Sequence, residues 1–266
     1  MSILIADDSA TIRRFVFDAV QAAPVAPDIV EAVDGPGCLE HLSSGSFDVA
    51  FVDVNMPGLS GMEALAESRR KGITTFVVIM SSEMDRDRLA FARTLGAYDY
   101  LAKPFTGKDV SAILENYVRF TRPTSALLVD DSAATRSVIK RVMEDSLFEL
   151  QIDEAIDGPS AIVAYQSGQH DIVFLDINMP GLSGIDTLET LRKIKADVKV
   201  ALITAERSAE LDRSLAEGKF DVLLYKPFFA EDVDQALHTL FGLRQPSLVD
   251  AGSKSEPEPA REQVAI

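Results

Sequence analysis

The sequence lacks several features on which large classes of proteins depend. It has a single cysteine, Cys38, so no disulfide can form within the chain, and a thiolate metal cluster is not expected. Basic residues are also scarce: 26 lysines and arginines stand against 42 aspartates and glutamates, a net charge of −16. Affinity for a phosphate backbone comes largely from Lys and Arg, so we expect no nucleic-acid partner.

Long apolar runs are missing as well. The most apolar stretches, such as residues 76–80, extend over about five residues, whereas a helix that crosses a bilayer needs about 20. The N-terminus has no basic start and reaches Asp7 and Asp8 after one short apolar run, unlike a signal peptide. We therefore expect a cytoplasmic protein without membrane insertion. Its 266 residues suffice for one large domain or two modest ones.

What the sequence does contain is a repeat. Residues 55–61 (Asn-Met-Pro-Gly-Leu-Ser-Gly) recur unchanged at 178–184, an offset of 123 residues. The same offset relates four further pairs of landmarks without net insertion, and a period of this length corresponds to a whole domain. These pairs are Asp7–Ala10 with Asp130–Ala133, Asp34–Pro36 with Asp157–Pro159, Asp53 with Asp176, and Lys103–Phe105 with Lys226–Phe228.

The repeat sets the predicted domain boundaries. We expect a first domain over residues 1–121, a linker at 122–124 in which Pro123 opposes helix continuation, and a second domain over 125–244. Residues 245–266 contain three prolines and four acidic residues but few large apolar side chains. This composition predicts an acidic, disordered tail.

Within each copy, short β-rich runs alternate with amphipathic stretches of helical period. Apolar strands that alternate with helices predict a parallel sheet covered on both faces. The expected fold class is therefore α/β, with two flavodoxin-like, doubly wound (βα)5 domains in tandem and a parallel five-stranded sheet in each. In the first copy the expected strands are 3–6, 28–33, 49–53, 76–80 and 98–101, and the expected helices are 9–21, 37–43, 62–71, 84–94 and 108–120.

Acidic residues follow several of the predicted strands. The carboxyl ends of parallel strands meet at one edge of the sheet, which is where such sheets bind ligands. Three carboxylates there repel one another unless a cation such as Mg²⁺ intervenes. A metal and an ammonium would hold the oxygens of a phosphoryl group, which leaves one carboxylate to act as nucleophile. The converging residues are Asp7, Asp8, Asp53, Ser81 and Lys103 in the first copy and Asp130, Asp131, Asp176, Thr204 and Lys226 in the second.

At these residues each copy resembles a receiver domain of the two-component response regulators. The resemblance rests on the whole set at these spacings, including the Asn-Met-Pro-Gly turn, and covers about nine-tenths of the chain. It implies that Asp53 and Asp176 accept a phosphoryl group from phosphohistidine on a histidine kinase or a histidine phosphotransfer protein. It also implies one Mg²⁺ or Mn²⁺ per domain, and a phosphoryl-accepting signalling protein with self-dephosphorylation rather than an enzyme.

The resemblance further implies a role for each residue of the set. The metal ligands would be Asp8, Asp53 and the main-chain carbonyl of Asn55, and likewise Asp131, Asp176 and that of Asn178, with Asp7 and Asp130 acting mainly through bound water. The lysines that pair with the phosphoryl oxygens would be Lys103 and Lys226, each before a cis proline. The hydroxyls that follow the phosphoryl group would be those of Ser81 and Thr204.

One position distinguishes the two copies. Receivers commonly carry an aromatic residue three positions before the lysine, which swings inward when the hydroxyl engages the phosphoryl group. The first copy has Tyr100 there as its expected switch, whereas the second has Leu223, with Tyr225 displaced to the position next to the lysine. Because leucine has no hydroxyl, we predict that the second domain couples to its output surface differently.

Residues outside the set have plainer interpretations. Cys38 is expected to be a packing residue, and the three histidines surface or boundary residues: His41, His170 and His238. An acidic pair at a strand end can by itself be a solvated loop or a helix N-cap, but a full set that occurs twice indicates a site.

The consequence of phosphorylation is left open by the sequence. We expect no third domain after Arg244, which favours a tandem receiver that signals to a protein target as adaptor, phosphate sink or relay, with self-association into a homodimer left open. The alternative is the regulatory part of a diguanylate-cyclase-type response regulator. A phosphatase of the haloacid dehalogenase group needs an Asp two residues after the nucleophile, where this chain has Asn55 and Asn178.

The neighbours of the acceptor predict a short-lived phosphoryl group. Asn55 and Asn178 stand two residues past the acceptors, and Glu83 and Glu206 two past the hydroxyl residues, a pairing similar to that of the chemotaxis single-domain regulators. Polar side chains here can admit and orient an attacking water. Intact mass followed over time after removal of the phosphodonor should show transient phosphorylation in Mg²⁺, and an acyl phosphate that persists for hours would contradict this expectation.

Overall fold

The chain forms two compact units, which the computed structural model describes over residues 1–23, 27–83, 85–168 and 170–250. The first unit combines Met1–Tyr117 with the C-terminal segment that starts at Gln245, and the second is Val118–Arg244. Each unit is built on one parallel sheet of five strands. The predicted fold class is confirmed for both copies.

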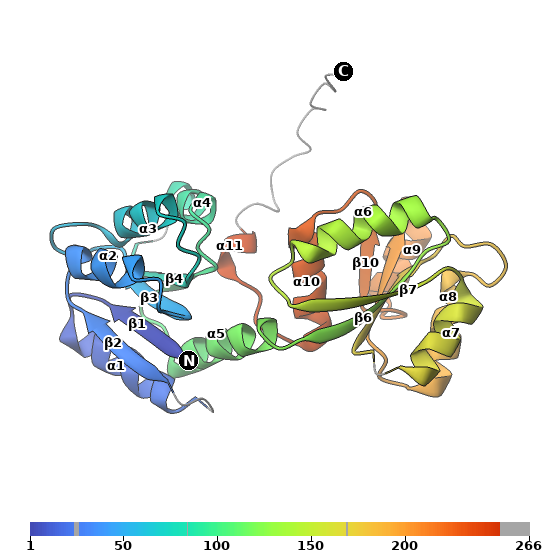
Figure 1. Cartoon of the computed structure of the whole chain (residues 1–266), viewed down its shortest axis with the longest axis horizontal. Helices are drawn as coiled ribbons and strands as arrows, with labels where there is room; N and C mark the ends of the chain where they lie inside the picture. Colours follow the sequence, from blue (N-terminus) through green and yellow to red (C-terminus); the bar gives the residue numbers. More distant parts are fainter. Residues whose placement is uncertain (24–26, 84, 169, 251–266) are drawn as a thin grey trace, which may run out of the picture. The chain divides into compact units, whose positions relative to one another are not determined.

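The first sheet has the strand order β2-β1-β3-β4-β5, and all its strand pairs are parallel. Its strands are β1 (Ser2–Ala6), β2 (Asp28–Ala32), β3 (Val49–Asp53), β4 (Phe76–Ser81) and β5 (Asp99–Ala102). The helices are α1 (Ala10–Gln21), α2 (Gly35–Ser43), α3 (Gly61–Arg70), α4 (Arg86–Thr94) and α5 (Gly107–Phe120). Helices α2, α3 and α4 lie on one face of the sheet, and α1 and α5 lie on the other (Figure 1).

The second sheet repeats this order as β7-β6-β8-β9-β10. Its strands are β6 (Thr124–Val129), β7 (Leu150–Ala155), β8 (Ile172–Asp176), β9 (Val200–Thr204) and β10 (Val222–Tyr225). The helices are α6 (Ala133–Glu144), α7 (Gly158–Ser167), α8 (Gly184–Ile194), α9 (Ala209–Ala216) and α10 (Ala230–Phe241). Helix α7 packs against α8, and α6 packs against α10.

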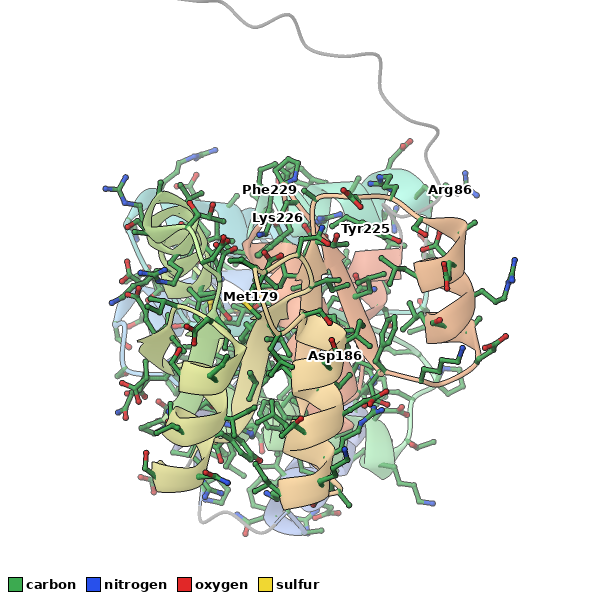
Figure 2. The ribbon with its side chains drawn as sticks, turned by 90° about the vertical axis from the view of Figure 1, so that its right-hand side faces the viewer. Arg86, Met179, Asp186, Tyr225, Lys226 and Phe229 are labelled. Carbon is green, nitrogen blue, oxygen red and sulfur yellow. The ribbon has the colours of Figure 1, made fainter. Side chains whose placement is uncertain are left out.

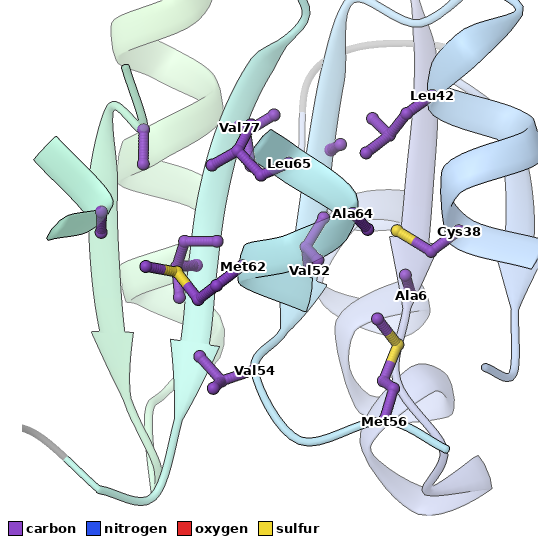
Figure 3. Close-up of a cluster of buried hydrophobic side chains, with 14 of the residues drawn as sticks. Ala6, Cys38, Leu42, Val52, Val54, Met56, Met62, Ala64, Leu65 and Val77 are labelled. Atoms are coloured by element: carbon purple, nitrogen blue, oxygen red, sulfur yellow. The ribbon is translucent and has the colours of Figure 1, made fainter. Parts of the chain in front are cut away.

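Apolar side chains from both layers form the core of the first unit. Every residue of β3 is buried, as expected for a central strand covered on both faces. Figure 3 shows Cys38 and Leu42 of α2 packed in one cluster with Leu65 of α3 and Val52 of β3. Cys38 is fully buried, as the sequence predicted, and burial raises the pKa of its thiol to about 12.

The largest differences from the predicted elements of the first copy lie at the starts of two helices, α2 and α4. Helix α2 begins at Gly35, two residues early, because the Asp34 side chain caps it by accepting a hydrogen bond from the Gly37 N–H (2.8 Å). Asp85 caps α4 in the same way, with the Arg88 N–H at 2.7 Å, and the predicted start of this helix at residue 84 lies outside the described residues. No helix in the described part of the chain is both long and apolar enough to cross a membrane.

The segment after the second unit differs from the predicted disordered tail. Residues Ser247–Asp250 form the short helix α11, which packs against β5 and α4 within the first unit. Leu248 is only 2% exposed there and belongs to the apolar core of that unit. Polar composition predicted disorder from residue 245, but a single buried leucine supplies the apolar contact that composition does not reveal. The remainder of the predicted tail, 251–266, lies outside the described residues.

The two units also divide inside α5, between Tyr117 and Val118, rather than at the predicted boundary after residue 121. The end of the helix, from Val118 on, belongs to the second unit, in which the Phe120 ring lies edge-on to Phe148 at 4.7 Å and to His238 at 5.3 Å. His238 is 1% exposed and is therefore not the surface or boundary residue that we expected. Its aromatic neighbours come from elements far away in the sequence. His41 and His170 are half-buried.

Next to His238, a carboxylate is held in a poorly solvated position on α10. One oxygen of Asp234 accepts hydrogen bonds from the Ser146 hydroxyl (2.6 Å) and from the Leu147 N–H (3.0 Å). Burial raises the pKa of the Asp234 carboxyl to about 6, against the opposing effect of these hydrogen bonds. A carboxyl whose pKa is raised by folding stabilises the folded state below its unfolded pKa, and that contribution is lost as the pH rises through about 6.

Asp234→Asn should therefore stabilise the second unit at neutral pH. The amide oxygen can still accept both hydrogen bonds, and the side chain carries no charge. The variant should therefore gain about 1–3 kcal/mol in free energy of unfolding at pH 7.5. This gain should vanish towards pH 4, where the aspartic acid is itself neutral. Urea denaturation of the full chain at both pH values measures this. Asp221→Asn, which removes one exposed charge from the same unit, is the control. A gain that is equal at both pH values would contradict the assignment.

Candidate functional site

The site of the first unit is centred on a lysine that joins two buried carboxylates. Lys103 follows β5, and its Nζ lies 2.6 Å from Asp7 Oδ2 and 2.6 Å from Asp53 Oδ1. Asp53 is the last residue of β3, and Asp7 follows β1. These strands neighbour each other in the centre of the sheet, so the fold brings the two aspartates together at its carboxyl edge.

Backbone donors fix the remaining oxygens of both carboxylates. The Asn55 N–H donates to the second oxygen of Asp53 (2.8 Å), and the Ser9 N–H donates to the second oxygen of Asp7 (2.9 Å). Both carboxylates are almost fully buried, and such groups are stable only when they are paired and hydrogen-bonded. The carboxylates are thus held in place before any ligand binds.

The second unit repeats this arrangement. Lys226 Nζ lies 2.6 Å from Asp130 Oδ2 and 3.1 Å from Asp176 Oδ1, and the Ser132 N–H donates to Asp130 (2.9 Å). Figure 2 shows Lys226 beside Tyr225 and Phe229 at the end of the sheet where β10 stops. The Lys103–Pro104 and Lys226–Pro227 peptide bonds are both cis, as the resemblance implied.

The two sites differ in the position of the third carboxylate, Asp131 in the second unit and Asp8 in the first. Oxygens of Asp130, Asp131 and Asp176 all lie within 4.8 Å of one another, and no other described His, Cys, Asp or Glu residues form such a group of three. Three carboxylate oxygens at this spacing fit a hard divalent cation such as Mg²⁺. In the first unit Asp8 is exposed and does not complete an equally close group with Asp7 and Asp53.

Burial and charge pull the ionisation of these groups in opposite directions. Burial raises the pKa of the Asp53 carboxyl, and the charge of Asp7 adds to this, while the hydrogen bond from Lys103 lowers it. Burial lowers the pKa of the Lys103 ammonium, but the hydrogen bonds and charges of Asp53 and Asp7 outweigh it, so the net shift is upward. Burial raises the pKa of Asp176 as well. A second positive charge at the site would oppose these upward shifts of the carboxylates.

The hydroxyl residues Ser81 and Thr204 end the strands next to those that end in Asp53 and Asp176. Ser81 and Thr204 are fully buried, and the oxygen of each accepts a hydrogen bond from a main-chain N–H two residues on, Glu83 or Glu206, at 3.1 Å. The two hydroxyl residues also accept the lysine N–H on their main-chain carbonyls, at 2.8 Å for Ser81 and 2.7 Å for Thr204. In both units a main-chain hydrogen bond thereby connects the lysine to the hydroxyl residue at the end of the neighbouring strand.

Sequence reasoning missed an arginine in each unit. Arg13 donates to the main-chain carbonyl of Asp7 (2.9 Å) and pairs with Glu31 (2.7 Å), so it supports the loop that carries the acidic pair. Arg136 makes the same contacts with Asp130 (2.8 Å) and Glu154 (2.8 Å). The available signal was the offset of 123 residues, which relates both the arginines and the glutamates.

The comparison with known protein families shows to which family the chain belongs. The model of the response regulator receiver domain matches the chain twice, over residues 3–115 and 126–238. The chain belongs to the response regulator receiver family. It is a response regulator of two-component signalling with two receivers in tandem, and receivers are typically phosphoryl-accepting modules that bind Mg²⁺ and take their phosphoryl group from a histidine kinase.

Individual relatives are similar to single receivers of this chain. The chemotaxis protein CheY of Pseudomonas aeruginosa is 34% identical over 119 residues, which are 43% of this chain and 94% of CheY. The transcriptional regulatory protein CiaR of Streptococcus pneumoniae is 32% identical over 128 residues, 47% of this chain, and the match spans only 56% of CiaR. A solved response regulator/GGDEF domain protein, 26% identical, aligns with 90% of this chain and 99% of its own, with a TM-score of 0.58.

The receivers differ at the position expected to act as a switch. Tyr100 of the first receiver is buried, and its hydroxyl donates to the main-chain carbonyl of Glu83. In the second receiver Leu223 is half-buried, and Tyr225 instead donates to Asp212 of α9 (2.5 Å) with the Arg207 guanidinium 4.7 Å from its ring centre. The hydroxyl of the second tyrosine therefore binds to α9, and its ring contacts the loop beside the site through Arg207.

Two glycines allow the acceptor strands to approach the following helices. A Cβ on Gly61 would lie 2.0 Å from the Asp53 carbonyl oxygen, and a Cβ on Gly184 would lie 2.2 Å from that of Asp176. Such distances require the acceptor backbone to move.

Gly61→Ala should therefore displace Asp53 and destabilise the first receiver by about 1–3 kcal/mol, as overpacking commonly does. Urea denaturation of the full chain measures the stability. The matched control is Gly107→Ala at the start of α5, where the nearest atom, the Cβ of Ala19, is 3.7 Å away. Equal stability of the two variants would contradict the steric assignment.

Proposed function

We propose that each receiver accepts a phosphoryl group on its central aspartate, Asp53 in the first and Asp176 in the second, from phosphohistidine on a histidine kinase or a histidine phosphotransfer protein. The observation that carries this proposal is the half-buried lysine between two buried aspartates at the carboxyl edge of each sheet, with Lys103 at 2.6 Å from Asp7 and Asp53. A purely structural ion pair would not require a further aspartate and a hydroxyl residue at the same edge, yet both copies have them: Asp8 and Ser81 in the first, and Asp131 and Thr204 in the second.

The reaction assigns one role to each group. A carboxylate oxygen of Asp53 attacks phosphorus, an acyl phosphate bond forms, and the phosphorus–nitrogen bond breaks with its electron pair going to the imidazole. Lys103 offsets the negative charge on the transferred oxygens, and the Ser81 hydroxyl donates to one of them. In the second receiver Asp176, Lys226 and Thr204 take the corresponding roles.

The metal would be held by the carboxylates that the sheet edge collects. In the second receiver these are Asp131 and Asp176, with Asp130 acting through water and the carbonyl of Asn178 as a further ligand. In the first receiver Asp8, Asp53 and the carbonyl of Asn55 would take these places, with Asp7 acting through water. When bound, Mg²⁺ or Mn²⁺ supplies positive charge for the phosphoryl oxygens.

The signal would leave the first receiver through Tyr100. The Tyr100 hydroxyl donates a hydrogen bond to the Glu83 carbonyl, and the Glu83 N–H donates one to the Ser81 hydroxyl. A movement of the Ser81 hydroxyl towards a phosphoryl group would therefore shift the loop before α4 and the tyrosine with it. The second receiver lacks this connection at Leu223, and we expect its output to differ. We propose that the target is a protein, with the chain acting as adaptor, phosphate sink or relay.

The similarity to a response regulator/GGDEF domain protein over 90% of this chain supports a second candidate. In that case the two receivers would form the regulatory part of a diguanylate-cyclase-type response regulator. The two candidates share the phosphorylation chemistry and differ only in the domain that is regulated.

Counting phosphoryl groups tests the proposal. After incubation with acetyl phosphate and Mg²⁺, intact mass should show two groups on the wild type and one on each of Asp53→Ala and Asp176→Ala. Asp28→Ala, which removes an exposed aspartate from β2, is the control and should keep two. A single group that only one of the two variants loses would make the other receiver a structural partner.

A further inference from the structure

Helix α11 occupies the edge of the first receiver that β5 and α4 form. The Ser247 N–H donates to Asp99 Oδ1 of β5 at 2.7 Å, and Leu248 is 2% exposed. Leu248 lies in the same buried cluster as Tyr100, Leu89 and Ala97. A short segment thus makes one partly buried hydrogen bond and one buried apolar contact at a single place.

Asp99 is suited to receive this segment. It is a fully buried aspartate on the edge strand of the sheet, and the same oxygen also accepts the N–H of Tyr100 (2.7 Å). A buried carboxylate is retained at a modest energetic cost only when donors surround it, and the first N–H of a helix has no acceptor within the helix itself. The corresponding residue of the second receiver is Val222, whose side chain has no acceptor.

The second receiver shows what this edge is like without such a segment. There α9, β10 and α10 line an open groove of about 430 Å³, which Leu215, Val222 and Tyr225 border. The edge formed by the last strand and the helix before it is thus covered by α11 in the first receiver, whereas an open groove lies there in the second.

The covered edge is connected to the proposed acceptor. Leu248 and Tyr100 share one apolar cluster, the Tyr100 hydroxyl donates to the Glu83 carbonyl, and the Glu83 N–H donates to the Ser81 hydroxyl at 3.1 Å. Removing Leu248 would leave a gap in the cluster that also holds the Tyr100 ring, and looser packing there would make it easier for the ring to rotate outward. The contact at the edge therefore bears on the loop that carries Ser81.

We infer that residues 245–250 are an intramolecular ligand of the first receiver, which holds Tyr100 inward and thereby favours phosphorylation of Asp53. This inference rests on the proposed function, because it concerns the regulation of that acceptor. Coupling between two sites is reciprocal, so phosphorylation of Asp53 must strengthen the docking of α11 by the same factor.

The test uses the full chain with Leu248→Asp, which places a charge in the apolar cluster. Hydrogen exchange should show lost protection at residues 245–248 and in β5. In an Asp176→Ala background, with acetyl phosphate and Mg²⁺, the fraction phosphorylated at Asp53 should fall by roughly fivefold, within the usual range of coupling between sites. In an Asp53→Ala background, phosphorylation of Asp176 should stay unchanged.

Two truncated chains and a proline variant separate docking from a general effect of the C-terminal residues. A chain that ends after Asp250 keeps α11 and should behave as wild type, whereas a chain that ends after Arg244 should behave as Leu248→Asp. Ser247→Pro removes the N–H that Asp99 accepts, at a helix position that tolerates proline, and should also weaken protection.

Each outcome bears on a different part of the inference. Lost protection with unchanged or increased phosphorylation of Asp53 overturns the coupling, as does an equal change at Asp176. Protection that rises with protein concentration overturns the intramolecular assignment in favour of a second copy. If the wild type takes no phosphoryl group on Asp53, the proposed function and the coupling fail together, while the exchange data still decide whether α11 docks.

Discussion

The structure depends on the neutralisation of carboxylates that a parallel sheet collects at one edge. The fold ends its central strands beside each other, so Asp7 and Asp53 must share a buried position. Lys103 makes this tolerable by placing one ammonium 2.6 Å from both. An unpaired buried carboxylate would instead be driven to the protonated form, which is a poor nucleophile. The pair of aspartates is therefore at once a cost to the fold and the basis of its chemistry.

The geometry around Lys103 and the two aspartates depends on the backbone as much as on side chains. The N–H groups of Ser9 and Asn55 fix one oxygen on each aspartate, and Gly61 lets the next helix start against the Asp53 carbonyl. Arg13 supports the acidic loop from behind. The contacts of Ser9, Gly61 and Arg13 recur in the second receiver at Ser132, Gly184 and Arg136, so this part of the shared backbone supports both sites.

The two receivers diverge where they face outward. The acidic groups of the second receiver are gathered more closely, and its tyrosine is bonded to Asp212 on α9. In the first receiver Tyr100 reaches back to the loop beside the acceptor, and α11 covers the neighbouring edge through Leu248. The two copies thus share the arrangement of lysine and aspartates at the sheet edge, while the edges next to the last strand have become different surfaces.

The sequence by itself determined the duplication, the strand and helix order and which residues meet at the carboxyl edge of each sheet, because these depend on local periodicity and on which strand each residue ends. Tertiary structure alone decided the close triad at Asp131, the burial of His238 and the docking of Leu248. Each of these depends on side-chain positions contributed by distant segments. Composition predicted disorder over residues 245–266, yet Leu248 packs in the core of the first receiver and the Ser247 N–H donates to Asp99 of β5. Whether a short segment is ordered depends on the surface against which it packs, and the local sequence pattern contains no information about that surface.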